Sequence, residues 1–186
     1  MPAAANPTPD IDSNTAAPRL LVVADHYEID PERPLGTGGM SIVYEARDLK
    51  NRRTVAIRTL RAEGIRDEPV LAAMAAVPRA EFVSLRFADR AWDNHPLPIG
   101  FGQTISQPLV VALMIEFAGV APGDHVLDVG TGSGYQAAVL AEIGCVVSGI
   151  EVVPELAAAA AQTLARLGYD ADVVAGDGHQ GRPDLA

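Results

Sequence analysis

The sequence predicts an α/β fold with a parallel sheet, and three observations support the prediction. Apolar runs with the length of buried strands occupy residues 125–129, 146–151 and 171–175. Two segments with helical spacing, 135–143 and 154–167, separate these runs, and each is followed by a glycine. Alternation of this kind is typical of βαβ units, in which helices join parallel strands. Three parallel strands with two crossover helices are therefore expected.

The loop after the first strand carries the strongest functional signal. Asp128 and Val129 end the strand, and three alternating glycines precede the helix that starts at Tyr135. Glycine accepts positive φ, and the amides at a helix start attract electron-rich groups. A dinucleotide-binding loop would need a glycine at position 135. The spacing instead resembles the S-adenosylmethionine loop of Rossmann-like methyltransferases, and the alternative is a glycine-rich turn that binds no ligand.

Charge and composition argue against several kinds of partner. The chain has 186 residues, enough for one ordinary domain and an appendage, and its 48% apolar residues can form a core. A net charge of -10 and a pI near 4.7 argue against nucleic acid, because phosphate-binding surfaces are basic. No apolar run reaches membrane-spanning length, so no membrane partner is expected.

The leader, the cysteine and the histidines predict little chemistry. Residues 1–18 lack the basic start and apolar core of a signal peptide, so we expect a disordered leader on a cytoplasmic protein. Cys145 is the single cysteine, which excludes an internal disulfide, and its apolar setting favours a buried thiol over a nucleophile. The four histidines have no metal-ligand spacing, so no metal site is assigned.

The short apolar runs in residues 19–58 predict a small antiparallel sheet, with strands at 21–23, 42–46 and 54–57. Residues 34–44, followed by Val55 to Arg58, resemble the glycine-rich loop and third strand of bacterial serine/threonine protein kinases. Arg58 stands where those kinases have lysine, and its planar group does not replace a compact ammonium. Neither the catalytic-loop residues nor a DFG motif follows, so the resemblance implies a passive fragment without kinase activity.

Two helices are expected in the middle of the chain. Asp67 can cap a helix over 69–76, which ends because the residue before Pro78 avoids the α region. A second helix begins at Pro108, with an expected buried stripe of Val111, Met114, Ile115 and Ala118. Between them, residues 91–108 are expected to form a long functional loop, dense in proline and glycine.

That loop and the glycine loop together resemble the protein-L-isoaspartate O-methyltransferase family from about Leu60 to Pro183. The resemblance implies a Rossmann-like methyltransferase domain over 59–186 and S-adenosyl-L-methionine as cofactor. It also implies methyl transfer to the α-carboxylate of L-isoaspartyl residues in damaged proteins. The ester then closes to a succinimide, and hydrolysis of that ring restores some normal aspartate.

The resemblance assigns roles to the Thr-Ile-Ser segment and to two strand ends. Ser106 is the implied active-site residue. Ser106 or Gln107 could also cap the helix that follows, and the two roles can coexist. Glu151 ends the second strand, where an acid can accept both ribose hydroxyls, and a surface charge is the alternative. Asp177 is implied to bind the adenine amine, with Gly178 allowing close approach. The full set expected to bind the cofactor is Gln103, Thr104, Ile105, Ser106, Asp128, Gly130, Thr131, Gly132, Ser133, Gly134, Glu151, Val152, Asp177 and Gly178.

The resembling family continues into further strands on the other side of the first strand. The edge of strand 125–129 is therefore expected to be unpaired and apolar. We expect a truncated enzyme, a partial gene product or one segment of a larger protein, which is a monomer when complete and can associate through this edge. The competing hypothesis is an inactive fragment that serves as a nucleotide-binding, cofactor-binding or interaction module.

Overall fold

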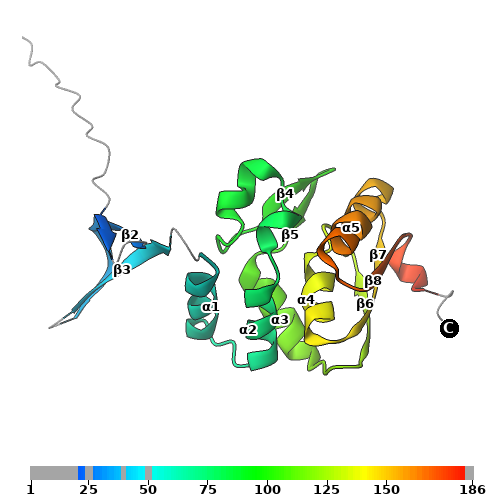
Figure 1. Ribbon diagram of the computed structural model, residues 1–186, viewed down its shortest axis with the longest axis horizontal. Coiled ribbons are helices and arrows are strands. Elements are labelled where there is room, and N and C mark those ends of the chain that lie inside the picture. The colour runs from blue at the N-terminus through cyan, green and yellow to red at the C-terminus, as the bar shows by residue number, and fades with distance from the viewer. Residues whose placement is uncertain (1–20, 24–26, 39–40, 49–51, 183–186) are drawn as a thin grey trace, which may run out of the picture. The chain divides into compact units, whose positions relative to one another are not determined.

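The computed structural model describes residues 21–23, 27–38, 41–48 and 52–182 (Figure 1). Contacts divide the chain into two compact units, residues 1–50 and 51–186. The expected leader over 1–18 lies outside the described residues.

The first unit is an antiparallel sheet with strand order β1-β2-β3. Its strands are β1 (Leu21–Val23), β2 (Tyr27–Gly38) and β3 (Ser41–Asp48). The expected strands at 21–23 and 42–46 are confirmed. β2 was not foreseen, and its end contains Gly36 and Gly38, which had been expected in a loop, with Gly38 paired to Ser41.

The strand expected at 54–57 is wrong, because these residues lie in helix α1 (Arg52–Ala62). Leu60 is 2% exposed in the core and Ile57, one turn earlier, packs partly buried against it, whereas Arg58 is exposed. Spacing of three residues between buried side chains suits a helix, and the short apolar alternation misled the prediction. Arg58 therefore does not stand on a strand, as the lysine of a kinase would.

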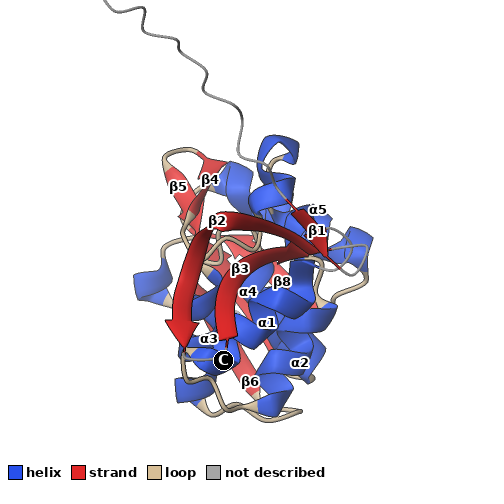
Figure 2. Ribbon diagram, turned by 90° about the vertical axis from the view of Figure 1, so that its left-hand side faces the viewer, coloured by secondary structure: helices blue, strands red, loops and turns tan. Residues whose placement is uncertain are grey.

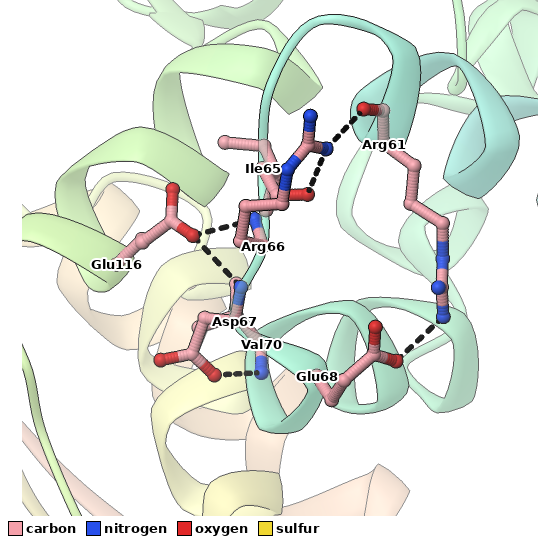
Figure 3. Close-up of polar contacts among 7 residues, drawn as sticks. All are labelled: Arg61, Ile65, Arg66, Asp67, Glu68, Val70 and Glu116. Carbon is pink, nitrogen blue, oxygen red and sulfur yellow. Dashed lines mark hydrogen bonds and ion pairs between the residues drawn. The ribbon is translucent and has the colours of Figure 1, made fainter.

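The start of helix α2 (Glu68–Ala76) is held by two carboxylates (Figure 3). Asp67 is the N-cap, as expected, and its side chain accepts from the Val70 amide at 3.1 Å. Glu116, on helix α3 (Pro108–Ala118), accepts from the amides of Arg66 and Asp67 at 2.6 and 2.7 Å. Amides before and inside the first turn are thus satisfied by side chains, which ties α2 to α3.

Removal of the α2 cap is expected to destabilise the protein measurably. Asp67→Ala leaves the Val70 amide without its acceptor, which should lower the free energy of unfolding by about 1 kcal/mol. Urea unfolding followed by circular dichroism measures the loss. Asp170→Ala, at an exposed aspartate, is the matched control and should change the value by less than about 0.5 kcal/mol. Equal stabilities of the two variants would contradict the capping role.

The second unit contains a parallel sheet in the order β6-β7-β8. The strands are β6 (His125–Val129), β7 (Val146–Glu151) and β8 (Ala171–Ala175), and helices α4 (Tyr135–Ile143) and α5 (Pro154–Leu167) connect them. Both helices end at glycines with φ of 102° and 81°, Gly144 and Gly168. All five predicted elements are confirmed with their predicted bounds.

The two faces of this sheet are covered unequally. The covered face turns Asp128, Val147 and Gly149 toward the helices, and in Figure 2 strands β6 and β8 lie behind α4. The opposite face carries Leu127 and Val129, which are 42% and 58% exposed. Among the described residues β6 pairs with β7 alone, which confirms the expected unpaired edge. An exposed apolar strand edge of this kind can associate with other chains.

The buried face of α3 differs from the expected stripe. Val111 and Ile115 are buried as expected, and Ala112 joins them, but Met114 is 43% exposed and Ala118 is also exposed. Helix α3 is apolar almost all round, so its hydrophobic pattern does not select one face.

Within residues 91–108, where one long loop had been expected, residues 97–105 form a β-hairpin. Strands β4 (Leu97–Gly100) and β5 (Gln103–Ile105) pair antiparallel, with Leu97 opposite Ile105. Both side chains of this pair are buried and anchor the hairpin in the core. The turn residues Phe101 and Gly102 have φ of 52° and 72°, the positive values that tight hairpin turns require. Two short 3₁₀ helices, Arg79–Phe82 and Leu85–Arg90, precede the hairpin, and a third, Gly178–Gln180, follows β8.

Cys145, just before β7, is 6% exposed, and its thiol lies 3.6 Å from the Ala121 carbonyl oxygen. The expected burial of Cys145 is confirmed, and burial raises the pKa of this thiol. No helix in the described part of the chain combines the length and the hydropathy that a membrane span would need.

Candidate functional site

The glycine loop after β6 has a backbone that other residues would strain. Gly130, Gly132 and Gly134 have φ of 75°, 58° and 85°. A Cβ at position 134 would lie 3.1 Å from Cδ1 of Leu164, on α5, so this glycine also allows close packing of α4 against α5. The Gly130 amide donates to the Ile150 carbonyl at 2.8 Å, which fixes the loop to the end of β7. The loop is thus held to the end of β7 by a hydrogen bond and to α5 by close packing.

Glu151, at the end of β7, is 5% exposed and joins two loops. Its carboxylate accepts from the Gly132 amide at 2.9 Å and from the Val153 amide at 3.0 Å. The surface-charge alternative is therefore wrong. Each carboxylate oxygen retains a second lone pair, which hydroxyl groups of a ligand could use. Val152, between these loops, is 69% exposed and offers an apolar contact beside the acid.

Asp128, near the end of β6, holds the glycine loop through side-chain hydrogen bonds. It is 5% exposed and accepts from the Thr131 hydroxyl at 2.6 Å and from the Gln136 amide nitrogen at 2.9 Å. Burial raises the pKa of this carboxyl, and the two hydrogen bonds favour the charged form. Asp128 thus ties the loop to the first turn of α4. Gln136 was missed from the sequence, and its polar side chain in an apolar helix was the available signal.

The turn after β8 approaches the end of β6. A Cβ at Gly178 would lie 2.4 Å from Cγ1 of Val129, so only glycine fits there without a shift. Asp177 Oδ1 accepts from the His179 amide at 3.0 Å and lies 2.9 Å from His179 Nδ1. The amide hydrogen bond and then the ring contact hold the pKa of Asp177 below its usual range. The ionised Asp177 carboxylate is therefore a hydrogen-bond acceptor that lies just beyond the end of β8.

The hairpin lies against the glycine loop. Cδ1 of Ile99, on β4, is 3.3 Å from the position of a Cβ at Gly132. On β5, Ile105 is buried while Gln103 and Thr104 are exposed, as is Ser106 just beyond the strand. Alternation along a strand turns neighbouring side chains to opposite faces, so the buried isoleucine presents Thr104 and Ser106 outward.

The cap of α3 comes from a residue outside the Thr-Ile-Ser segment. Asn94 Oδ1 accepts from the Leu109 amide at 3.2 Å, whereas Gln107, the N-cap residue, makes no side-chain cap bond. Asn94 takes this role because Pro108 follows an extended Gln107, and the loop residue reaches the second amide of the helix. Gln107 thus holds the expected N-cap position, but the expected side-chain cap from it is wrong. Ser106 instead contributes its backbone carbonyl, which accepts from Arg79 Nη2 at 2.5 Å.

Comparison with known proteins is decisive for the family. Residues 51–186 match the family model described as protein-L-isoaspartate(D-aspartate) O-methyltransferase. The chain belongs to this family. A protein-L-isoaspartate O-methyltransferase of Gloeobacter violaceus is 55% identical over 128 residues, which are 68% of this chain and 62% of that protein. The chain spans 51–64% of the length of curated relatives that it matches.

Solved structures of the same methyltransferase family share the fold. One protein-L-isoaspartate O-methyltransferase matches with a TM-score of 0.64 and 28% identity, covering 72% of this chain and 45% of that one. A Plasmodium falciparum chain described as this methyltransferase, solved in complex with S-adenosyl-L-homocysteine, matches with a TM-score of 0.54 and 26% identity. That match covers 63% of this chain and 56% of the other. The second unit therefore has the Rossmann-like methyltransferase fold.

The methyltransferase fold brings most of the expected site together. The glycine loop, Glu151 and Gly178 meet at the carboxyl ends of β6 to β8, where ligands bind in such sheets. The β4–β5 hairpin joins them through Ile99. Over the described residues, no group of three or more His, Cys, Asp or Glu side chains could hold a metal ion.

Proposed function

We propose that this chain forms the cofactor site and substrate-contact segment of a protein-L-isoaspartate O-methyltransferase. The observation that supports this best is the contact between two separate parts of the sequence. The loop of Gly132, held by Glu151 at 2.9 Å, lies directly under Ile99 of the hairpin that presents Thr104 and Ser106. A cofactor-binding loop and a substrate-binding segment must adjoin for a group to pass between their ligands.

The residues present fit S-adenosyl-L-methionine. The two buried oxygens of Glu151 retain acceptor capacity for ribose hydroxyls, and ionised Asp177 can accept from an exocyclic amine. A side chain at position 178 would collide with Val129, so Gly178 lets the turn that carries Asp177 lie against the end of β6. When bound, the cofactor supplies a methyl group on a positively charged sulfur. Asp128 holds the glycine loop that would receive the methionine end.

The residues of the chain would promote the reaction by orienting the substrate carboxylate toward the methyl group. The α-carboxylate of an L-isoaspartyl residue is ionised at neutral pH, so the reaction needs no general base. The Ser106 hydroxyl, exposed just beyond β5, would donate a hydrogen bond to that carboxylate and aim one oxygen at the methyl group. Exclusion of water by the hairpin would leave the carboxylate less solvated and more reactive.

Methyl transfer to an isoaspartyl peptide tests the proposal. With labelled S-adenosylmethionine, the chain should methylate an isoaspartyl peptide and leave the matched aspartyl peptide unlabelled. Loss of one hydrogen bond to a charged group should make Ser106→Ala about 10- to 100-fold lower in kcat/KM. Ser84→Ala, at another exposed serine, is the control and should keep full activity. No transfer by a chain that still binds S-adenosylhomocysteine would confine the function to cofactor binding.

A second candidate function concerns the sheet of residues 21–48. The pairing of Gly38 with Ser41 places a glycine-rich segment at the end of two antiparallel strands, an arrangement that could cover phosphate groups. We propose it as a passive nucleotide-binding or interaction segment. Thermal-shift measurements separate the two candidates, because a ligand raises the melting temperature of the state that binds it. Stabilisation by S-adenosylhomocysteine supports the methyltransferase, and stabilisation by ATP alone supports the alternative.

A further inference from the structure

Arg79 is a fully buried cation in the second unit. Its side chain is 0% exposed, and no Asp or Glu among the described residues forms an ion pair with it. Burial lowers the pKa of its guanidinium. Arginine is rarely buried without an acidic partner, because removing its charge from water is costly. Such a residue must make other contacts that compensate for this cost.

These contacts go to the two ends of the hairpin segment. Arg79 Nε donates to the carbonyl oxygen of Ala91 at 2.6 Å, and Nη2 donates to that of Ser106 at 2.5 Å. Ala91 precedes β4 and Ser106 directly follows β5. The planar guanidinium has donors in a fixed arrangement, so it fixes two carbonyls at once more firmly than a lysine ammonium can. One side chain therefore closes the base of the segment that carries Thr104 and Ser106.

The same guanidinium also contacts the helix that begins at the glycine loop. Its central carbon lies 4.4 Å from the ring centroid of Tyr135, in cation–π geometry. Tyr135 is the first residue of α4, directly after Gly134, and is 1% exposed. Phe82 holds the tyrosine ring from the side, with centroids 5.6 Å apart and planes at 69°. Arg79 thus contacts both parts of the proposed site, the hairpin segment through its carbonyls and the start of α4, beside the glycine loop, through Tyr135.

We propose that Arg79 is a positioning residue that sets the place of the Thr104–Ser106 segment relative to the glycine loop. The inference rests on the proposed function, in which these two parts hold the two reactants. Arg79 would touch neither reactant and would act through the Ser106 carbonyl and the Tyr135 ring. Displacement of a reacting group by about 1 Å can lower a rate about 100-fold.

Arg79→Met, which keeps an apolar stem and removes both donors, is the main test. Hydrogen exchange measured by mass spectrometry should become about tenfold faster over residues 97–106 and stay unchanged in β6 to β8. Calorimetry should show affinity for S-adenosylhomocysteine within about threefold of wild type, because the glycine loop and Glu151 are untouched. Turnover of an isoaspartyl peptide should fall about 100-fold. Arg58→Met, at an exposed arginine, is the control and should match wild type in all three.

Arg79→Lys separates positioning from general stability, and it also serves if the methionine variant does not fold. Lysine keeps the charge over the tyrosine ring but can hold the two carbonyls less well, so exchange over 97–106 should lie between wild type and the methionine variant. Unchanged exchange of this segment in a folded variant would overturn the proposal, as would equal acceleration throughout the unit. Lack of methyl transfer by the wild-type chain would refute the proposed function alone, since exchange and cofactor binding are measured without turnover.

Discussion

Glu151→Gln is expected to weaken binding of S-adenosylhomocysteine about 100-fold, the largest effect on ligand binding that we predict. The carboxylate already accepts from the amides of Gly132 and Val153, and we propose that it also accepts from ribose hydroxyls. Glutamine has one acceptor oxygen, and its amide group would face one of the two backbone amides, donor against donor. Isothermal titration of the purified chain measures the loss.

The control for this experiment is Glu155→Gln, which removes the same charge from an exposed position in the first turn of α5. Its affinity should stay within about threefold of wild type. A nucleoside pair separates the ribose contact from a loosened loop. Wild type should prefer adenosine over 2′,3′-dideoxyadenosine, and Glu151→Gln should lose that preference. An unchanged preference would mean that Glu151 only holds the two loops.

Gly134→Ala is expected to lower the free energy of unfolding by about 3 kcal/mol, the largest change in stability that we predict. Two costs add at this position. The backbone φ of 85° is unfavourable for a residue with a Cβ, and that Cβ would lie 3.1 Å from Leu164 and 3.3 Å from Ala160. Helices α4 and α5 would have to separate, so cofactor affinity should fall as well. Urea unfolding at neutral pH gives the stability.

Gly168→Ala isolates the backbone cost, because its φ of 81° is nearly the same and nothing lies within 4 Å of the added Cβ. This variant should lose only about 1 kcal/mol. The difference between the two variants, about 2 kcal/mol, then measures the packing of α4 against α5. Equal losses would show that close packing at the glycine loop contributes nothing.

The parallel sheet and its helices were predictable because each element has a local signal. Apolar strands of five or six residues, helical spacing between them and a glycine at each helix end left no competing assignment for β6 to β8. Glu151 could be placed for the same reason, because the end of a parallel strand is defined once the strand is. The local pattern thus identified both the cofactor half of the fold and its acid.

The features that could not be predicted depend on contacts between residues that are far apart in the sequence. Helix α1 contains the short apolar run 55–57, which also suits a strand, whereas Leu60 and Ile57 pack against the core at helical spacing. The cap of α3 comes from Asn94, which is 15 residues before its partner Leu109. Arg79 contacts residues 12 and 27 positions away, Ala91 and Ser106. Propensity and periodicity describe neighbours along the chain, so they do not reveal such pairs.

The reactivity of Cys145 can be used to measure local opening of the region just before β7. Cys145 is the only cysteine, lies just before β7 and is 6% exposed, so a thiol-specific dye reacts with it only when that region opens. Because burial also raises the pKa of the thiol, little reactive thiolate is present in the closed state. The rate of dye incorporation would therefore measure, without any mutation, how often the region around Cys145 opens and how far a bound ligand slows that opening.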